Sequence, residues 1–473
     1  MSKSYDIVVL GGGIGGYSAA IRAAQFGKSV AIVERDKLGG TCLHRGCIPS
    51  KALLKSAELY ARLKEGDTYG ITVGEVGLNY EKVLARKNDI VEQLYKGVQY
   101  LMKKNKIDVL NGNGRIVPPS IFSPKSGTVA VEQEDGETIT VEPGHLIIAT
   151  GSKPRLLPGL EANGETISTS DHAVHWNELP RSVIIVGGGV IGVEWASLLH
   201  DFGVEVTIVE TESRLLALED EDISKELQKE FSKRGIQVLT DTRIDTHSIN
   251  TEKGQVSLSA SRNEETIELK AEKMLISVGR EANLDQLGLE NTDVKLANGF
   301  VKVNANLQTA ESHIYAIGDC IGGVQLAHSA SYEGIAAVDH IVGQKPHHYP
   351  PHQIPRCTYA RPESASIGFT EKQAREQGIS VQIAKVPFRA IGKAVISGEP
   401  EGFAKVIADK DSGDLLGLHL IGHHATDLIS EAALAQLLDA TPWEMSMTIH
   451  PHPSASEIIG EAMLAVQGKS MSS

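Results

Sequence analysis

Cysteine, aromatic side chains and long apolar runs are all scarce in this sequence. Its 473 residues include only four cysteines, and Phe, Trp and Tyr together make up 5% of the chain. Four cysteines are too few for the disulfide framework of a small secreted domain. No stretch of about 18 consecutive apolar residues occurs, so we expect no membrane span. The first residues lead directly into a probable strand and do not read as a signal or transit peptide, so we expect a cytoplasmic protein.

An excess of positive charge is also missing. The chain has 46 Lys and Arg residues against 60 Asp and Glu residues, which gives a net charge of −14 at pH 7. The phosphate backbone of a nucleic acid is bound by clustered basic side chains, so this balance argues against a nucleic-acid partner. Glycine, by contrast, is abundant, with 47 residues. The length suffices for roughly two to four domains with large buried cores.

Some of these glycines form a dinucleotide-binding pattern near the N-terminus. An apolar run at 7–10 reads as a buried strand, a helical pattern follows, and a second apolar run at 30–33 ends at Glu34. Three glycines in G-x-G-x-x-G spacing follow the first run: Gly11, Gly13 and Gly16. The first allows a tight turn, the second lets a pyrophosphate approach the backbone, and the third lets helix and strand pack. The terminal acid binds a ribose hydroxyl, so the whole series predicts a dinucleotide site.

The same pattern occurs a second time, and each member follows its counterpart by 176 residues. The members of this copy are Gly187, Gly189, Gly192 and Glu210. We therefore expect the chain to bind two dinucleotides. An arginine near the terminal acid would select the 2′-phosphate of NADP, whereas an acid prefers the free hydroxyl of NAD. Glu212 adds a second acid, and the nearby base, Arg214, lies four positions beyond Glu210, so the second site is predicted to take NAD.

Three further segments are strand-like, and the first two end in a glycine turn. They lie at 145–155, 273–283 and 309–320, and the third carries Asp319, a short acid suited to a ribityl or ribose hydroxyl. A proline-rich stretch at 343–355 predicts a boundary, and alternating residues beyond it favour an antiparallel sheet. We therefore predict an α/β fold with two Rossmann-like domains and a C-terminal α+β domain. The expected domains are the first nucleotide domain at 1–150, the second at 151–275, a central part completing the first at 276–346, and the C-terminal domain at 347–473.

Two of the four cysteines, Cys42 and Cys47, stand close together in "GGTCLHRGCIPSK" (39–51). Zinc binding would need two more Cys or His residues at metal spacing, but Cys320 and Cys357 stand alone, so no metal is expected. A structural staple would close a very small loop and add little stability. A redox role fits better, because a helix start after two glycines stabilises a thiolate close to a bound dinucleotide. The pair is therefore predicted to form a redox-active disulfide.

With these motifs in place, the sequence resembles the pyridine nucleotide–disulfide oxidoreductase family over essentially its whole length. Further motifs that carry the resemblance are "ATGS" at 149, "SVGR" at 277, "YAIGD" at 315, "LAHSASYEG" at 326 and "HPHPSASE" at 450. The resemblance implies FAD at the first fingerprint, NAD at the second, and a homodimer formed through the C-terminal domain. The "CIPSK" continuation favours the branch that oxidises protein-bound dihydrolipoamide to lipoamide and reduces NAD⁺ to NADH. Its implied partners are the lipoyl domains and the subunit-binding domain of a 2-oxo acid dehydrogenase acyltransferase.

The resemblance also implies roles for single residues. It places Lys51 against the flavin, and the other implied FAD contacts are Gly114, Thr150, Gly151, Asp319 and Ala327. Glu194 and Gly279 would border the nicotinamide half of NAD. The match at 450 makes His452 the catalytic base, oriented by Glu457, because histidine exchanges a thiol proton near neutral pH. In the family this histidine reaches the disulfide of the other subunit, and the neighbouring His450 is expected to be non-catalytic.

Two stretches depart from the family pattern. Leu43, His44 and Arg45 stand where Leu-Asn-Val is frequent, so Arg45 either tunes the thiolates or faces solvent. His423 and His424 replace a turn that usually contains proline.

Three alternative functions compete with dihydrolipoamide oxidation. A glutathione-type reductase would carry arginines near Glu210, and a mercuric reductase would end in a cysteine pair, whereas this chain ends in "AVQGKSMSS". A non-catalytic flavin- and nucleotide-binding regulator would have no use for the cysteine pair with His452 and Glu457. The sequence leaves open which 2-oxo acid complex, or the glycine cleavage system, the chain serves.

Overall fold

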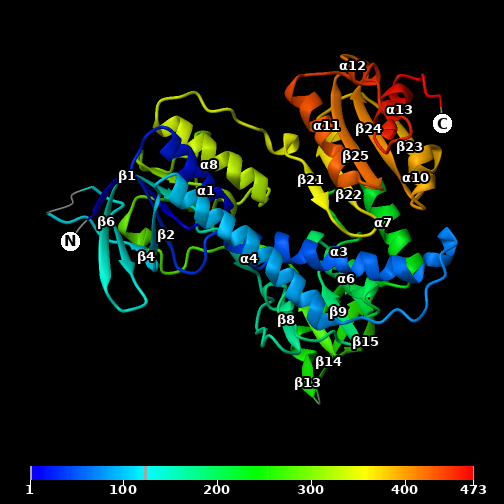
Figure 1. The fold of residues 1–473 in the computed structure, drawn as a ribbon, viewed down its shortest axis with the longest axis horizontal. Coiled ribbons are helices and arrows are strands. Elements are labelled where there is room, and N and C mark those ends of the chain that lie inside the picture. The colour runs from blue at the N-terminus through cyan, green and yellow to red at the C-terminus, as the bar shows by residue number, and fades with distance from the viewer. Residues whose placement is uncertain (1–2, 122–124, 253, 472–473) are drawn as a thin grey trace. The chain divides into compact units, whose positions relative to one another are not determined.

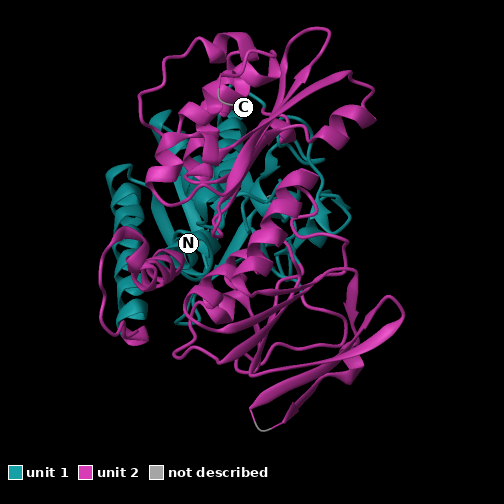
Figure 2. Ribbon diagram, turned by 90° about the vertical axis from the view of Figure 1, so that its right-hand side faces the viewer, with its two compact units in different colours: residues 1–52, 82–155, 279–348 teal, residues 53–81, 156–278, 349–473 magenta. Residues whose placement is uncertain are grey.

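The computed structural model describes residues 3–121, 125–252 and 254–471 (Figure 1). The chain folds into two compact units, each assembled from three separate stretches (Figure 2). Unit 1 comprises 1–52, 82–155 and 279–348, and unit 2 comprises 53–81, 156–278 and 349–473. Two of the unit boundaries fall inside the long helices α3 (Cys47–Lys64) and α4 (Tyr80–Lys104).

Unit 1 is built on a seven-stranded sheet with a parallel centre. β1 (Lys3–Leu10) pairs in parallel with β2 (Val30–Glu34) and with β6 (Thr138–Ile148). β3 (Asp108–Asn111) continues beyond β2, and β20 (Ile314–Ala316) pairs in parallel with β6. β5 (Val129–Glu132) and β4 (Asn113–Ile116) extend the sheet with antiparallel pairing. Because parallel strands are buried on both faces, they appear in the sequence as continuous apolar runs, which is why the runs at 7–10 and 30–33 could be recognised.

Two helices pack together on one face of this sheet (Figure 1). They are α1 (Ile14–Gln25) and α8 (Ala327–Ile341). Their close approach depends on glycine, because a Cβ on Gly15 would lie 2.9 Å from the carbonyl oxygen of Ala330. A Cβ on Gly334 would likewise lie 2.6 Å from the carbonyl oxygen of Gly15. The N-terminal ends of both helices are thereby held together, with α1 starting where β1 ends, the edge at which α/β sheets bind ligands.

Unit 2 contains a second parallel sheet with the strand order β11-β10-β9-β16-β8. Its strands are β8 (Ile167–Thr169), β9 (Ser182–Val186), β10 (Glu205–Val209), β11 (Gln237–Leu239) and β16 (Lys273–Ile276). Helix α6 (Val190–Asp201) connects β9 to β10, and α7 (Glu221–Arg234) connects β10 to β11. A smaller antiparallel sheet is formed by β12 (Thr242–Ile244), β13 (Asn250–Glu252), β14 (Gln255–Arg262) and β15 (Glu265–Ala271). The series β9-α6-β10 repeats the order of β1-α1-β2.

The C-terminal part of unit 2 is a five-stranded antiparallel sheet covered by helices. Its strands are β21 (Arg356–Thr358), β22 (Ser364–Gly368), β23 (Val381–Pro387), β24 (Gly402–Asp409) and β25 (Leu415–Gly422). Buried side chains of these strands share one core with α11 (Ala425–Leu437) and α13 (Glu457–Val466). The antiparallel sheet expected after the proline-rich stretch is therefore present.

The remaining elements are short. The helices are α2 (Gly40–His44), α5 (Ser170–Ala173), α9 (Glu371–Glu376), α10 (Gly392–Ile396) and α12 (Pro442–Ser446). The strands are β7 (Ser152–Pro154), β17 (Arg280–Ala282), β18 (Leu296–Ala297) and β19 (Phe300–Val301). Six 3₁₀ turns in the described ranges are Gly66–Tyr69, Thr246–Ser248, Leu289–Asn291, Gly318–Ile321, Pro351–Gln353 and Phe388–Ala390. None of the helices within the described ranges is long and apolar enough to cross a membrane.

The expected strands at 145–155 and 273–283 prove to be two strands each. β6 ends at Ile148 and β7 begins at Ser152, while β16 ends at Ile276 and β17 begins at Arg280. The break is caused by the glycine turn in each segment, since Gly151 and Gly279 both have positive φ. After these turns the two segments meet, because β7 pairs antiparallel with β17.

Candidate active site

The cysteine pair lies at the junction of two helices in unit 1. Cys42 belongs to the short helix α2, and Cys47 is the first residue of α3. The sequence suggests that both open one helix, but the chain leaves helical geometry at Arg45. Among the described residues neither cysteine forms a disulfide, and both are half-buried. Only Cys47 therefore occupies the N-terminus of a long helix.

Glycines anchor this segment to the first fingerprint. Gly39 and Gly40 both have positive φ, which allows the chain to turn sharply into α2. The N–H of Gly39 donates to the carbonyl of Gly12 at 2.8 Å. A Cβ on Gly40 would lie 2.8 Å from Cα of Gly13, so no larger residue fits there. The thiols are thereby tied directly to the expected phosphate-binding loop.

The two thiols are coupled to each other. The hydrogen bond with Cys47 and the burial of the sulfur both raise the pKa of the Cys42 thiol far above its ordinary range, while nearby Lys51 acts in the opposite direction. Cys42 therefore keeps its proton and donates it to the sulfur of Cys47.

The unusual residues between the cysteines make contacts of their own. Arg45 forms an exposed ion pair with Asp36. The Nε2 atom of His44 lies 2.8 Å from the carbonyl oxygen of Leu38, and its ring meets Tyr95 edge-on at 5.3 Å. The alternative that Arg45 faces solvent is therefore the one that the structure supports.

The first fingerprint forms a tight loop between β1 and α1. Gly11 has a φ of +104°, and a Cβ on Gly16 would lie 2.0 Å from the carbonyl oxygen of Gly11, so both positions demand glycine. A Cβ on Gly13, by contrast, would enter open space at the start of α1. The carboxylate of Glu34 closes the loop by accepting the N–H of Gly12 at 2.7 Å. The loop thus offers free space and helix N–H groups, which suit a pyrophosphate.

The second fingerprint repeats this geometry between β9 and α6. Gly187 has a φ of +108°, and a Cβ on Gly192 would lie 1.9 Å from the carbonyl oxygen of Gly187. A Cβ on Gly189 would again enter open space. The carboxylate of Glu210 accepts the N–H of Gly188, as Glu34 does in the first copy. The sequence repeat is therefore a structural repeat.

The base near the second fingerprint is engaged elsewhere. Arg214 donates from Nη2 to the carbonyl oxygen of Ala217 at 2.7 Å. The other carboxylate oxygen of Glu210 accepts the N–H of Glu212 at 2.8 Å. The acids Glu210 and Glu212 thus lie at the end of β10, which favours a ribose with a free 2′-hydroxyl.

Residues from three distant motifs of unit 1 meet around Ser152. Arg280 donates to the Ser152 hydroxyl at 2.7 Å and to its carbonyl oxygen at 2.8 Å. The same hydroxyl donates to Asp319. Thr150 and Gly151 lie in the turn just before, and the carbonyl of Gly151 accepts the N–H of Asn283 at 2.9 Å. Asp319 and the turn at 150–151 are thus brought together, and Ser152 and Arg280 are residues of this cluster that the sequence analysis did not single out.

Two more unassigned residues lie near the start of α8, where Ala327 is the first helical residue. The Nε2 atom of Gln325 is buried and has no hydrogen-bond acceptor among the residues that the structure describes. Glu333 accepts the N–H of Gly318 at 2.6 Å and so holds the turn that carries Asp319. An unsatisfied buried donor beside a helix N-terminus fits a ligand with acceptor atoms, such as a flavin nucleotide. Gln325 directly precedes the "LAHSASYEG" motif and Glu333 lies within it, so the motif could have pointed to both residues.

The other expected contact residues are placed as follows. Lys51 lies one helical turn after Cys47 on α3, and its charge acts on Cys42. A Cβ on Gly114 would lie 2.8 Å from Val33 and 2.9 Å from Leu10, so β4 approaches the fingerprint strands closely there. Glu194 is buried in α6 and accepts the N–H of Tyr359 at 3.0 Å. Gly279 belongs to unit 1, whereas Glu194 belongs to unit 2.

His452 and Glu457 form a hydrogen-bonded pair at the start of α13. The Nδ1 atom of His452 lies 2.8 Å from Oε1 of Glu457, whose Oε2 accepts the N–H of Ser454 at 2.9 Å. Although partial burial acts in the opposite direction, these bonds lower the pKa of Glu457. An ionised carboxylate only accepts hydrogen bonds, so Nδ1 of His452 is the donor. In the neutral form of the ring, the lone pair that can take a proton therefore lies on Nε2.

This histidine lies at an open surface of the chain. The side chain of His452 is 78% exposed. Large apolar side chains nearby in the sequence are exposed as well, and Ile449 is 94% exposed. The same holds for Trp443 and Met447. Several large exposed apolar residues so close in the sequence favour an interaction surface here.

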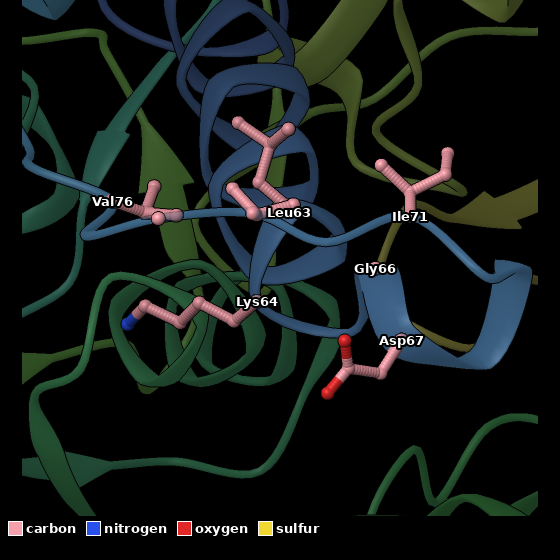
Figure 3. A pocket seen from close by; sticks show the side chains of 8 residues that line it. Leu63, Lys64, Gly66, Asp67, Ile71 and Val76 are labelled. Carbon is pink, nitrogen blue, oxygen red and sulfur yellow. The ribbon is translucent and has the colours of Figure 1, made fainter.

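A separate hollow of about 270 Å³ lies in unit 2, near the C-terminal end of α3 (Figure 3). Its lining residues are Leu63, Lys64, Gly66, Asp67, Ile71, Val73, Gly74 and Val76. None of the expected site residues lines it. Within the described ranges, no group of three or more His, Cys, Asp or Glu residues is arranged to hold a metal ion.

Comparisons with known proteins agree with this geometry. The family model described as pyridine nucleotide-disulphide oxidoreductase matches residues 5–334, and that of the family's dimerisation domain matches residues 354–463. The dihydrolipoyl dehydrogenase of Bacillus subtilis is 56% identical over 472 residues, which is 100% of both chains. Those of Zymomonas mobilis (39% identical, 100% of both chains) and Mycobacterium tuberculosis (42% identical, 98% of both chains) are also similar.

Solved structures are similar over nearly the full length. LpdA from Mycobacterium tuberculosis superposes with a TM-score of 0.90 at 27% identity, covering 97% of this chain and 99% of that one. The HOCl-induced flavoprotein disulfide reductase RclA from Escherichia coli gives a TM-score of 0.85 at 25% identity, covering 98% and 100%. The paired thiols, the two glycine loops and these matches together show that the chain belongs to the pyridine nucleotide–disulphide oxidoreductase family, among its dihydrolipoyl dehydrogenases.

Proposed function

We propose that this chain oxidises protein-bound dihydrolipoamide to lipoamide and reduces NAD⁺, using Cys42 and Cys47 as a redox-active pair. The observation that carries the proposal is the hydrogen bond between the two thiols in a segment anchored to the first glycine loop. The relatives named dihydrolipoyl dehydrogenase support dihydrolipoamide as the substrate. A protein that merely bound nucleotides would have no use for a coupled thiol pair at this position.

The two glycine loops fit the two dinucleotides of the family. FAD would be held by the residues expected for it, namely Gly11, Gly13, Gly16, Glu34, Lys51, Gly114, Thr150, Gly151, Asp319 and Ala327, together with Gln325. NAD would be held by Gly187, Gly189, Gly192, Glu194, Glu210 and Gly279. The open space beside Gly13 and Gly189 and the unsatisfied Gln325 amide are what support this fit. When bound, FAD would supply the acceptor for the electron pair of the thiols, and NAD⁺ would be the final hydride acceptor.

The chain's own part of the reaction is thiol–disulfide exchange. When the pair is oxidised, a thiolate of dihydrolipoamide attacks the sulfur of Cys42 and releases Cys47 as a thiolate. The second thiol of the substrate then displaces Cys42, which closes the lipoamide ring and leaves both cysteines reduced. One dithiol is oxidised and one disulfide is reduced, so two electrons move to the cysteine pair. In the reduced pair the thiol of Cys42 keeps its proton, because the hydrogen bond with Cys47 and burial raise its pKa.

His452 would take the proton of the attacking substrate thiol. Glu457 fixes the Nδ1–H tautomer, which leaves Nε2 free as the base. We propose that His452 serves the cysteine pair of a second copy of the chain. The exposure of the imidazole and of Ile449 beside it supports an action across a dimer interface.

We further propose the domain limits 1–150, 151–275, 276–346 and 347–473 for the FAD, NAD, central and dimerisation domains. The partners would be the lipoyl domains and the subunit-binding domain of a 2-oxo acid dehydrogenase acyltransferase. A cytoplasmic location fits a chain with only four cysteines, two of them in a pair that must be reduced and reoxidised.

The test is the exchange Cys42→Ser, measured with two electron acceptors. We expect NAD⁺-dependent oxidation of dihydrolipoamide to fall at least about a thousandfold, because the attacked sulfur is lost. Oxidation of NADH by an artificial dye should persist, since it does not need the thiols. Cys357→Ser, at the other half-buried cysteine, is the matched control and should leave both rates near wild type.

Equal losses of both activities in Cys42→Ser would contradict the proposal. Turnover of glutathione disulfide with NADPH by the wild type would instead support a glutathione-type reductase. If NADH produced no long-wavelength thiolate–flavin absorption band in the wild type, the chain would be a binding protein rather than an enzyme.

A further inference from the structure

A second histidine–carboxylate pair lies next to the first. The Nε2 atom of His450 lies 3.0 Å from Oε1 of Glu431, and the side chain of His450 is only 9% exposed. Glu431 stands on α11, whereas Glu457 is the first residue of α13. The segment with both histidines is therefore tied to two different helices, through His450 to α11 and through His452 to α13.

The buried imidazole also packs against α13. A Cβ on Gly460 would lie 2.9 Å from Nδ1 and 3.1 Å from Cε1 of His450, so the ring occupies the space that a side chain would need. Gly460 follows Glu457 by three residues and therefore lies on the same face of the helix. His450 thus touches the helical face from which Glu457 reaches His452.

The charges around His450 favour its protonated form. The hydrogen bond to Glu431 raises the pKa of His450, partly against the effect of burial, and the charges of Glu431 and Glu457 and a bond to the backbone of Thr448 add to the rise. The charged groups that face it are Glu431 from α11 and Glu457 from α13, with His452 on its own segment. Burial raises the pKa of Glu457, whereas its hydrogen bonds to His452 and Ser454 lower it. The positive charge of His450 adds a smaller lowering effect.

We propose that His450 is a positioning residue for the dihydrolipoamide reaction: anchored by Glu431 and packed over Gly460, it holds the first turn of α13 and with it the carboxylate of Glu457 that orients His452. This inference rests on the proposed function, because it requires that His452 be the base. His450 itself hands no proton to the substrate, which agrees with the expectation that it is not catalytic. Its contribution is to fix the carboxylate on which the orientation of His452 depends.

The experiment compares His450→Asn with His424→Asn in the full-length, flavin-containing enzyme. His424 forms an exposed pair with Asp427 at 3.6 Å at the start of the same helix α11, so the control removes a histidine–carboxylate pair by the same exchange. We expect His450→Asn to lower kcat for dihydrolipoamide about tenfold, as the loss of a buried charge-assisted bond would. Dye reduction by NADH should be unchanged in both variants.

A pH profile separates positioning from a merely structural role. Loss of the positive ring removes a charge that helps to lower the pKa of Glu457, so the acid limb of kcat/KM should move up by about half a pH unit in His450→Asn. His424→Asn should leave the limb in place. Glu431→Gln keeps the size of the side chain and serves as a second variant in case His450→Asn does not fold. We expect Glu431→Gln to lower kcat about threefold, because only the charge of the partner is lost.

Different outcomes would overturn the proposed function and the role of His450. If the wild type does not oxidise dihydrolipoamide, the proposed function fails. If the wild type is active but His450→Asn behaves like His424→Asn, or if Glu431→Gln has wild-type kcat, only the role of His450 is overturned. An equal loss of dye and dihydrolipoamide activity with an unmoved acid limb would make His450 a structural residue.

Discussion

Single functional side chains in this molecule are held in place by close neighbours. The hydrogen bond with Cys47 raises the pKa of Cys42. The N–H of Gly12 donates to the carboxylate of Glu34, and the N–H of Gly188 donates to that of Glu210. The types of these residues could be predicted, because the cysteine pair and the two glycine motifs with their acids are recognisable in the sequence. The direction of the thiol proton was not predictable, because the pKa of a thiol depends on burial and on the distance to its partner, which only folding sets.

The choice between NAD and NADP is a prediction at the scale of one residue. Glu210→Arg replaces the acid at the end of β10 with a base that can bind a 2′-phosphate. We expect the ratio of kcat/KM for NAD⁺ over NADP⁺ to fall about tenfold or more, the size of one charge-assisted contact. The ratio is the proper measure because the exchange also removes the bond to Gly188, which weakens both nucleotides.

Glu205→Arg is the matched control, since it makes the same charge change at the opposite end of β10. It should leave the ratio unchanged. An unchanged ratio in Glu210→Arg would show that the preference is decided elsewhere.

At the scale of the element, the strand–loop–helix unit depends on the closeness of two backbones. Gly16→Ala would place a methyl carbon 2.0 Å from the carbonyl oxygen of Gly11, so α1 can no longer pack against β1. We expect the variant to be purified without flavin or to fail to fold. Absorbance at the flavin band per mole of protein measures the result.

The control is the same exchange in an exposed helix. Gly97 lies in α4, and a Cβ there meets nothing within 4 Å. Gly97→Ala should bind flavin normally and raise the free energy of unfolding by up to about 1 kcal/mol. Normal flavin content in Gly16→Ala would refute the dependence of the loop on this glycine.

The C-terminal sheet carries a prediction about pH. His419 on β25 is fully buried, and burial lowers its pKa despite the nearby charge of Asp220. The folded state therefore binds this proton less readily than the unfolded state. Stability due to the neutral ring is complete above about pH 6.5 and is lost as the pH falls below that value towards the lower folded-state pKa.

His419→Asn removes this titration. We expect the variant to be less stable than the wild type at pH 8, because the bond to the carbonyl of Phe369 is lost, but the difference should shrink at pH 5. Urea unfolding at the two pH values measures it, with the exposed His247→Asn as control. A stability difference that grows towards acid pH would show that the pKa of His419 is raised by folding rather than lowered.

At the scale of the whole molecule, the exposed His452 and its apolar surroundings predict a site shared between two copies of the chain. Homodimers of Cys42→Ser and of His452→Gln should each be inactive with dihydrolipoamide. After random exchange of subunits, half of the dimers are mixed and each has one intact site. We therefore expect about a quarter of the wild-type rate to return.

The measurement is dihydrolipoamide oxidation before and after denaturation and refolding of an equal mixture. Each variant refolded alone is the control and should stay inactive. If the mixture also stayed inactive while mixed dimers formed, His452 would act within its own subunit.

The sequence by itself determined the local units: two glycine fingerprints, a cysteine pair, a C-terminal histidine with its acid, and the antiparallel character of the last domain. These follow from short-range rules, since turn geometry, strand burial and side-chain chemistry depend on neighbouring residues. Tertiary structure alone decided which thiol keeps the proton, the meeting of β7 with β17 around Ser152, and the burial of His450 against Gly460. Those features join residues far apart in the chain, and their energies depend on distances and desolvation that no local pattern contains.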